Sequence, residues 1–442
     1  MVARLLNKHF FNPALVLMLI GLGLYGQRAS AQGETYITVE DGQFIRHGAP
    51  YYFLGANLWY GMNLGSEGEG GDRARLIREL DRLQELGITN LRVMGATEGP
   101  ADAPWRVQPA LQNAPGEFDE ELLVGLDFLL AEMGKRDMNA VICMNNFFQW
   151  SGGMAQYVAW SQGVEIPYPH DPEHTWDEFQ RFSAEFFADR KAQRMFRQAL
   201  KTVIQRRNSI TGQLYEDDPA IMAWQLANEP RGFERAEAYA SWVGRTARYI
   251  HRLDKNHLVS LGGEGFLLPE VGTRFAEVSQ NRHLDYLTCH LWVENWGWYH
   301  PAQPEATYDS AWIKAVDYLG RHVELAARVN KPLVLEEFGV SRDGGIFADS
   351  ADTEWRDRFY ESLFTEILDH ARTRKVMAGC NFWSWSGEGI PLRPGESWEE
   401  GDPFTGDPPH EIQGWYGVYI HDLKTRELIR RNAREMNQLG EQ

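Results

Sequence analysis

The chain has 442 residues, of which 43% are hydrophobic and 24% are charged, a composition typical of globular proteins. Its 62 acidic and 44 basic side chains give a formal net charge of -18, which disfavours nucleic acids and anionic membranes as partners. Three cysteines are too few for a disulfide framework, so we expect buried thiols and stability that comes from the core.

The first 31 residues have the organisation of an export signal. Arg4 and Lys8 precede an unbroken apolar run at residues 14–24, and Ala29-Ser30-Ala31 matches the small-x-small pattern of a cleavage site. The run is shorter than the roughly 20 residues that span a bilayer. We therefore predict a signal peptide at 1–31 and a secreted or periplasmic mature protein at 32–442. The alternative is an uncleaved membrane anchor.

Residues 36–53 alternate apolar and polar side chains around Asp41-Gly42 and His47-Gly48, which predicts a short N-terminal β-hairpin. A repeating pattern follows in which a short apolar strand precedes a loop and an amphipathic helix. Strands are predicted at 52–56, 90–94, 140–144, 220–226, 258–261, 286–289, 333–335 and 379–383. Helices are predicted at 73–86, 120–136, 239–253, 309–329, 354–373 and 425–438.

Eight strands that alternate with helices, without a Pro/Gly/Ser-rich linker between halves, indicate a single α/β domain at 32–442. The predicted fold is a closed (β/α)8 TIM barrel preceded by the hairpin. The alternative is an open doubly wound sheet, which usually carries a glycine-rich turn after its first strand. Here that turn is Asn57-Leu58-Trp59-Tyr60, which cannot hold a pyrophosphate, so the barrel is preferred.

Two glutamates stand at the carboxyl ends of predicted strands, where the active site of such a barrel collects. Glu229 follows the fourth strand and Glu337 follows the seventh. Hydrolysis of an acetal needs one carboxyl group to protonate the leaving oxygen and another to attack the anomeric carbon or activate water. Because strands four and seven face each other across the barrel, both groups are expected in one cleft. The 16 tryptophans favour a sugar-binding groove, although most of them are expected to fill the core.

Six segments resemble glycoside hydrolase family 5, and more narrowly its endo-β-1,4-mannanases. They occur in order at predicted strand ends: LRVMG at 91–95, MNNF at 144–147, WQLANEPR at 224–231, CHLW at 289–292, LEEFG at 335–339 and NFW at 381–383. The resemblance extends from about residue 51 to about residue 417. It implies a retaining endo-β-1,4-mannanase that acts on mannan, galactomannan or glucomannan, and it implies neither a cofactor nor a metal. A monomer is the default expectation for a secreted depolymerase.

The resemblance also implies a role for individual residues. Glu229 would be the general acid/base and Glu337 the nucleophile, with Arg92 keeping the nucleophile ionised. Glu336 is expected to point away from the cleft, because side chains alternate along a strand. Substrate-binding residues are expected at Arg92, Asn145, Asn228, His290, Trp292 and Trp383.

One residue departs from the family pattern. Many members have a tyrosine two residues after the histidine, where this chain has Trp292, whose N–H can only donate, so the support of Glu337 is an open question. Trp160 and the segment 292–298 favour mannan over glucan. The alternatives are an endo-β-1,4-glucanase, an exo-β-mannosidase or, in a different class, a non-catalytic carbohydrate-binding barrel.

Overall fold

The computed structural model describes residues 35–267 and 271–440, so the predicted signal peptide lies outside the described residues. Eight parallel strands form one sheet in the order β10-β9-β8-β5-β4-β13-β12-β11. The strands are β4 (Phe53–Asn57), β5 (Asn90–Met94), β8 (Asn139–Cys143), β9 (Ile221–Gln225), β10 (Leu258–Ser260), β11 (Leu287–Leu291), β12 (Leu333–Phe338) and β13 (Met377–Phe382).

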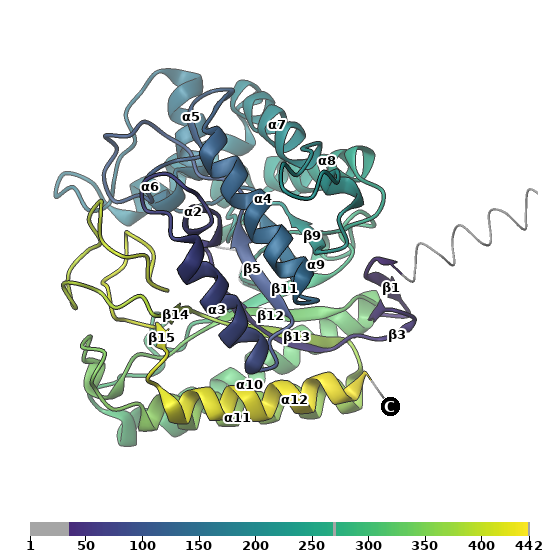
Figure 1. Cartoon of the computed structure of the whole chain (residues 1–442), viewed down its shortest axis with the longest axis vertical. Helices are drawn as coiled ribbons and strands as arrows, with labels where there is room; N and C mark the ends of the chain where they lie inside the picture. Colours follow the sequence, from purple (N-terminus) through teal and green to yellow (C-terminus); the bar gives the residue numbers. More distant parts are fainter. Residues whose placement is uncertain (1–34, 268–270, 441–442) are drawn as a thin grey trace, which may run out of the picture.

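The two outer strands of this order, β10 and β11, are joined by backbone hydrogen bonds. The Asp285 N–H donates to the Val259 carbonyl at 2.8 Å, and the His290 N–H donates to the Glu264 carbonyl at 2.9 Å. The sheet therefore curls into the predicted (β/α)8 barrel (Figure 1). Each of the eight predicted strands overlaps an observed one.

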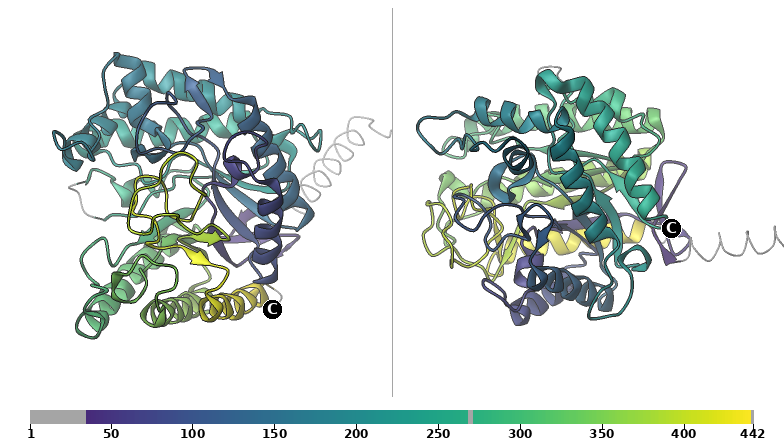
Figure 2. Two further views of the ribbon diagram at one scale, coloured as in Figure 1. Left: turned by 60° about the vertical axis from the view of Figure 1, so that its left-hand side comes forward. Right: turned by 90° about the horizontal axis from the view of Figure 1, so that it is seen from above.

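Helices pack around the outside of the barrel, as Figure 2 shows from two further sides. In α3 (Arg73–Glu85), buried leucines recur every three or four residues, and Asp72 caps the first turn by accepting from the Arg75 N–H. Among the described residues, no helix is both long and apolar enough to cross a membrane. The other long helices are α4 (Glu120–Lys135), α7 (Arg190–Ile204), α8 (Ala236–Leu253), α10 (Pro304–Val329), α11 (Glu354–Arg374) and α12 (Leu423–Leu439).

Shorter helices, absent from the predicted elements, lie mainly between β8 and β9. They are α5 (Gly153–Gln162) and α6 (Trp176–Ala184), with α2 (Gly61–Leu64) after β4 and α9 (Phe275–Val278) before β11. The Thr175 side chain and Glu178 form a capping box at the start of α6. This box fixes the start of α6.

The N-terminal segment covers one end of the barrel, at the right in Figure 1. It forms three short antiparallel strands, β1 (Thr38–Glu40), β2 (Gln43–Arg46) and β3 (Ala49–Pro50), so the predicted hairpin gains a third strand. Both Asp41-Gly42 and His47-Gly48 have positive φ angles, and each pair makes a tight turn. Phe44 packs against the rings of Phe53 and Tyr286, which closes this end.

A long loop lies at the opposite end of the barrel, beside the labels β14 and β15 in Figure 1. The short strands β14 (Trp385–Gly387) and β15 (Val418–Tyr419) pair and bracket residues 388–417, here called the mouth loop. The Asp407 carboxylate accepts from the backbone N–H groups of Gly414 at 2.9 Å and Tyr416 at 2.8 Å. Burial raises the pKa of Asp407 to about 6 despite these hydrogen bonds. The loop is thus tied to a buried carboxyl group.

A buried ion cluster fastens the end of this loop to the outer helices, and it carries a stability prediction. Arg342 and Arg356 pair with Asp422 at 2.7 and 2.9 Å. Replacing Asp422 with alanine leaves two buried guanidinium groups unpaired, so the free energy of unfolding should fall by about 3–5 kcal/mol. Urea denaturation measures this loss. The control is Asp309→Ala, because Asp309 forms only an exposed 4.0 Å pair, and equal losses would contradict the prediction.

The three cysteines lie on barrel strands. Cys143 is on β8, Cys289 on β11 and Cys380 on β13, and all three are buried and unpaired, as predicted. Burial raises the pKa of the Cys143 thiol to about 11. These thiols therefore pack as small apolar groups.

Candidate active site

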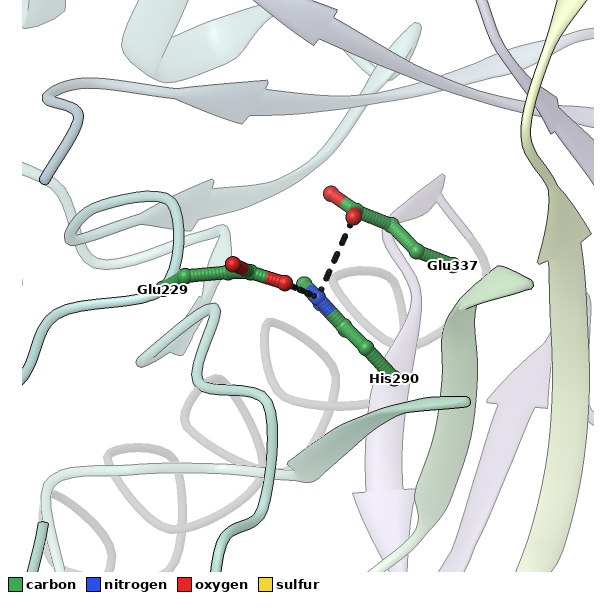
Figure 3. A group of neighbouring side chains, drawn as sticks. All are labelled: Glu229, His290 and Glu337. Carbon is green, nitrogen blue, oxygen red and sulfur yellow. Dashed lines mark hydrogen bonds and ion pairs between the residues drawn. The ribbon is translucent and has the colours of Figure 1, made fainter. Parts of the chain in front are cut away.

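The structure brings the two predicted catalytic glutamates together at the open end of the barrel. Glu229 follows β9, Glu337 lies near the end of β12, and His290 of β11 stands between their carboxylates (Figure 3). His290 Nδ1 is 2.6 Å from Glu229 Oε1 and 3.2 Å from Glu337 Oε2. One oxygen of each glutamate and a nitrogen of His290 all lie within 4.8 Å of one another. The pair therefore shares one site.

The backbone at Glu229 is in an uncommon conformation. Its φ angle is +49°, in the left-handed region that costs a non-glycine residue about 1–3 kcal/mol. The Glu229 N–H donates to the Gly262 carbonyl at 2.8 Å, which helps to hold the turn. The neighbouring Asn228 N–H donates to the Asn145 carbonyl at 2.9 Å. Strain of this kind collects at functional positions, and here it presents the carboxylate to the mouth of the barrel.

Arg92 on β5 connects the groups beneath the glutamates. Its guanidinium contacts the Glu337 carboxylate and donates to Asn228 Oδ1 at 2.7 Å and to Gln225 Oε1 at 2.8 Å. Burial by itself would raise the pKa of Glu337, but the charges of His290 and Arg92 outweigh it and lower this pKa. An ionised carboxylate is the form that attacks an electrophilic carbon. Arg92 and His290 thus support Glu337, which answers the question raised by Trp292 in place of the family's tyrosine.

Trp292 and Trp383 form an aromatic wall beside Glu337. The rings of Trp292 and Trp383 lie 6.1 Å apart, and Tyr416 of the mouth loop packs on the other side of Trp292 at 5.1 Å. The Tyr416 hydroxyl donates to Asn295 Oδ1 at 2.5 Å. Trp292 therefore packs between Trp383 and Tyr416, Asn295 orients Tyr416, and the contact of Trp292 with substrate stays a prediction.

A pocket of about 570 Å³ opens above this wall. Of the predicted site residues, Asn228, Glu229, Trp292, Glu337 and Trp383 line it. Arg92 and His290 lie directly beneath, in contact with the two carboxylates. Asn145 is fully buried, and its Oδ1 accepts from the Asn146 N–H at 2.8 Å, so its contact with substrate stays a prediction.

Most other lining residues come from loops, and sequence reasoning missed them. Trp296, in the predicted segment 292–298, lines the pocket. Trp160 is not among the lining residues and packs against Tyr157 at 5.6 Å. For the four missed residues that lie in residues 388–417, a signal was available in the length of this segment, with five prolines, because long loops in compact domains are commonly functional. The missed residues are Phe148, Trp150, Trp176, Gln180, Arg231, Glu264, Phe266, Asn295, His410, Glu411, Ile412 and Trp415.

On the Glu229 side, the pocket carries an ion pair held between two rings. Arg231 donates to both oxygens of Glu264 at 2.7 Å, and its guanidinium lies 5.3 Å from the ring centres of Phe148 and Phe266. Burial raises the pKa of Glu264 to about 7, with Arg231 opposing this rise. Trp176 is 43% exposed at the rim, so the pocket reaches solvent on this side.

The mouth loop covers another part of the pocket, and its His410 ring lies 6.4 Å from the rings of both Phe148 and Trp176. Trp59 Nε1 donates to the Gly406 carbonyl at 2.8 Å, and the Trp59 ring packs against Phe404 at 5.8 Å and Trp150 at 5.5 Å. His410 lies parallel to Trp150 with ring centres 6.3 Å apart. The space above the carboxyl ends of β4 and β5 is thus filled by side chains.

A pair of buried glutamates within 5 Å, at the floor of an aromatic pocket on a (β/α)8 barrel, is the arrangement of a glycoside hydrolase. A family model described as GH family 5 beta-mannosidase-like matches residues 34–441. The chain therefore belongs to glycoside hydrolase family 5, and the resemblance drawn from its sequence is confirmed.

Individual relatives agree with this assignment. The structure is similar to that of a family 5 mannosidase from Rhizomucor miehei, with 40% identity, a TM-score of 0.86, and coverage of 92% of this chain and 99% of that one. A mutant of that mannosidase has been solved in complex with mannosyl-fructose, at 39% identity and the same TM-score, covering 93% of this chain and 100% of that one. Mannan endo-1,4-beta-mannosidase 1 of Arabidopsis thaliana is 29% identical over 359 residues, 77% of this chain and 79% of that protein.

Proposed function

We propose that this enzyme hydrolyses β-1,4-mannosidic bonds with retention of anomeric configuration. The observation that carries the proposal is the spacing of the glutamates, whose nearest oxygens lie within 4.8 Å. Retaining glycosidases hold their two carboxyl groups about 5–5.5 Å apart, whereas inverting enzymes leave about 6.5–9.5 Å for a water molecule. The short spacing supports direct attack by one of the glutamates.

In the proposed cycle Glu337 is the nucleophile, because Arg92 and His290 keep its carboxyl group ionised. Glu337 attacks the anomeric carbon, the bond to the leaving oxygen breaks, and Glu229 gives that oxygen its proton. Glu229 then takes a proton from water, which attacks the glycosyl ester and frees Glu337. The cycle requires no metal and no cofactor.

We further propose that the bond cleaved is the terminal one, so that single mannose units are released. The mouth loop supplies His410, Glu411, Ile412 and Trp415 to the pocket lining, and its residues Phe404 and Gly406 are held against Trp59. The loop therefore limits how far a chain could continue beyond the cleaved sugar. Beyond this loop, the proposal is supported by names alone, since the family model is described as beta-mannosidase-like and the Rhizomucor miehei relative, at 40% identity, is called a mannosidase. Endo-hydrolysis of mannan is the second candidate, favoured by the names of the curated relatives.

The test incubates the purified enzyme with mannohexaose, galactomannan, carboxymethyl-cellulose and xylan. We expect mannose as the first product from mannohexaose, in its β-anomeric form by proton NMR, and little release from the cellulose derivative or xylan. Early mannobiose and mannotriose would instead favour the endo candidate. A first product in the α form would overturn retention, and binding without release of reducing ends would identify a carbohydrate-binding barrel.

Export of the enzyme is also proposed, with residues 1–31 removed as a signal peptide. The proposal is supported by the charged start, apolar run and Ala29-Ser30-Ala31 pattern of the sequence. A secreted or periplasmic location suits an enzyme whose polymeric substrate does not enter cells.

A further inference from the structure

Glu336, the residue before the proposed nucleophile, lies inside the barrel beneath the site. Its side chain is 1% exposed, and Gln225 Nε2 donates to its two oxygens at 2.9 and 2.7 Å. Its Oε2 atom is 3.6 Å from Arg92 Nε and 4.0 Å from His290 Nε2. The side chain does not line the pocket, but it does not point to the opposite face as simple strand alternation predicts. The pairing of β12 with β11 shifts register at this residue, and Glu336 and Glu337 both contact Arg92 and His290 inside the barrel.

His290 connects Glu336 to the reacting groups. Its Nδ1 atom stands between Glu229 and Glu337, at 2.6 and 3.2 Å. Its Nε2 atom is buried and has no hydrogen-bond partner among the described residues, and Glu336 is the carboxylate that faces it. The Nε2 edge of the ring therefore faces the Glu336 carboxylate, and the Nδ1 edge faces the two catalytic glutamates.

The charge on this ring depends on the surrounding carboxylates. Burial would lower the pKa of His290, but the charge of Glu337 and the contacts with Glu229, Glu336 and Glu337 raise it well above its ordinary value. Two further charged groups lie nearby. Arg92 contacts Glu337 and Glu336 from β5, and Glu264, which follows β10, interacts with His290 through space.

Two of these carboxylates change charge during the proposed cycle. When Glu337 forms the glycosyl ester, its negative charge disappears, and Glu229 gives up and regains a proton. Glu336 forms and breaks no bond in either step. It thus remains beside His290 when the charge of Glu337 is lost.

We propose that Glu336 is a positioning residue whose constant negative charge keeps His290 protonated through the glycosyl-enzyme stage, with the Nδ1–H directed at Glu229. This inference rests on the proposed roles of Glu229 and Glu337. Without that charge, a neutral His290 would carry its single proton on either nitrogen, and the hydrogen bond to Glu229 would lose its fixed direction. The second step, in which Glu229 activates water, would suffer most.

The kinetic test compares Glu336→Gln, which keeps the shape and removes the charge, with Glu336→Asp, which keeps the charge. For the glutamine variant we expect kcat to fall about 10- to 100-fold and KM to fall with it, because slow hydrolysis of the ester limits turnover. The alkaline limb of the kcat–pH profile should shift to lower pH by about 1 unit or more, since His290 loses its proton at a lower pH. The aspartate variant should restore the position of that limb.

A control variant separates this role from a purely structural one. Glu79 is as deeply buried and accepts from Arg75 and Trp385, on the side of the barrel away from His290. Glu79→Gln should lower stability without moving the pH profile. An unmoved alkaline limb in Glu336→Gln, or the same movement in Glu79→Gln, would overturn the proposal.

A direct measurement is independent of activity. Glu337→Gln imitates the uncharged ester, so the 15N shifts of the His290 ring can be followed against pH in this variant and in the double variant Glu336→Gln/Glu337→Gln. We expect His290 to stay protonated to higher pH in the single variant, and equal titrations would overturn the proposal. Because neither variant needs to turn over, this result distinguishes a failure here from a failure of the proposed reaction.

Discussion

Replacing Glu337 with alanine is expected to lower kcat for mannan hydrolysis by about 10⁴-fold or more, because no group remains to form the glycosyl ester. The released reducing ends measure the loss. With an activated aryl β-mannoside, added azide should restore turnover and give the α-mannosyl azide, since a small anion fits the space left by the carboxylate.

Glu361→Ala provides the control for this loss, because Glu361 pairs with Arg431 on the exposed surface, far from the pocket. This variant should keep wild-type activity. Unchanged mannan hydrolysis by the Glu337 variant would show that another residue is the nucleophile. Formation of the β-azide would show that azide does not take the place of Glu337.

Replacing Glu229 with alanine should lower kcat/KM on mannobiose by about 10²- to 10⁴-fold, the usual contribution of a general acid. The loss should depend on the leaving group. An aryl mannoside with an acidic phenol needs no proton to depart, so its glycosylation step should be much less affected than that of mannobiose. Comparing kcat/KM for both substrates measures this difference, and equal losses would argue against Glu229 as the acid.

The barrel could be predicted because each strand is a short apolar run between polar segments. β5 begins at Asn90 and ends at Met94, as predicted, since both boundaries coincide with a change in side-chain character. β12 is three residues longer than predicted. Its apolar run stops at Leu335, yet after a register shift at Glu336 the pairing with β11 resumes at Glu337 and Phe338, where catalysis rather than burial determines the side chains.

The site residues at strand ends could be predicted from the sequence, whereas the pocket residues on the mouth loop could not. Glu229, His290 and Glu337 lie at strand ends, so the fold class alone brings them together. His410 and Glu411 reach the pocket only through the path of the mouth loop, which has little regular structure and is fastened by Asp407. That path depends on tertiary contacts between residues far apart in the chain, which no local pattern of side chains encodes.

The three unpaired thiols give the folded barrel an internal reporter. Cys143, Cys289 and Cys380 lie on three strands of the closed sheet, and each side chain is at most 1% exposed. A thiol reagent reaches them only when the strands of the barrel separate, and movement of the surface loops alone leaves them covered. The rate of alkylation would therefore time the opening of the scaffold itself, without any label added to the protein.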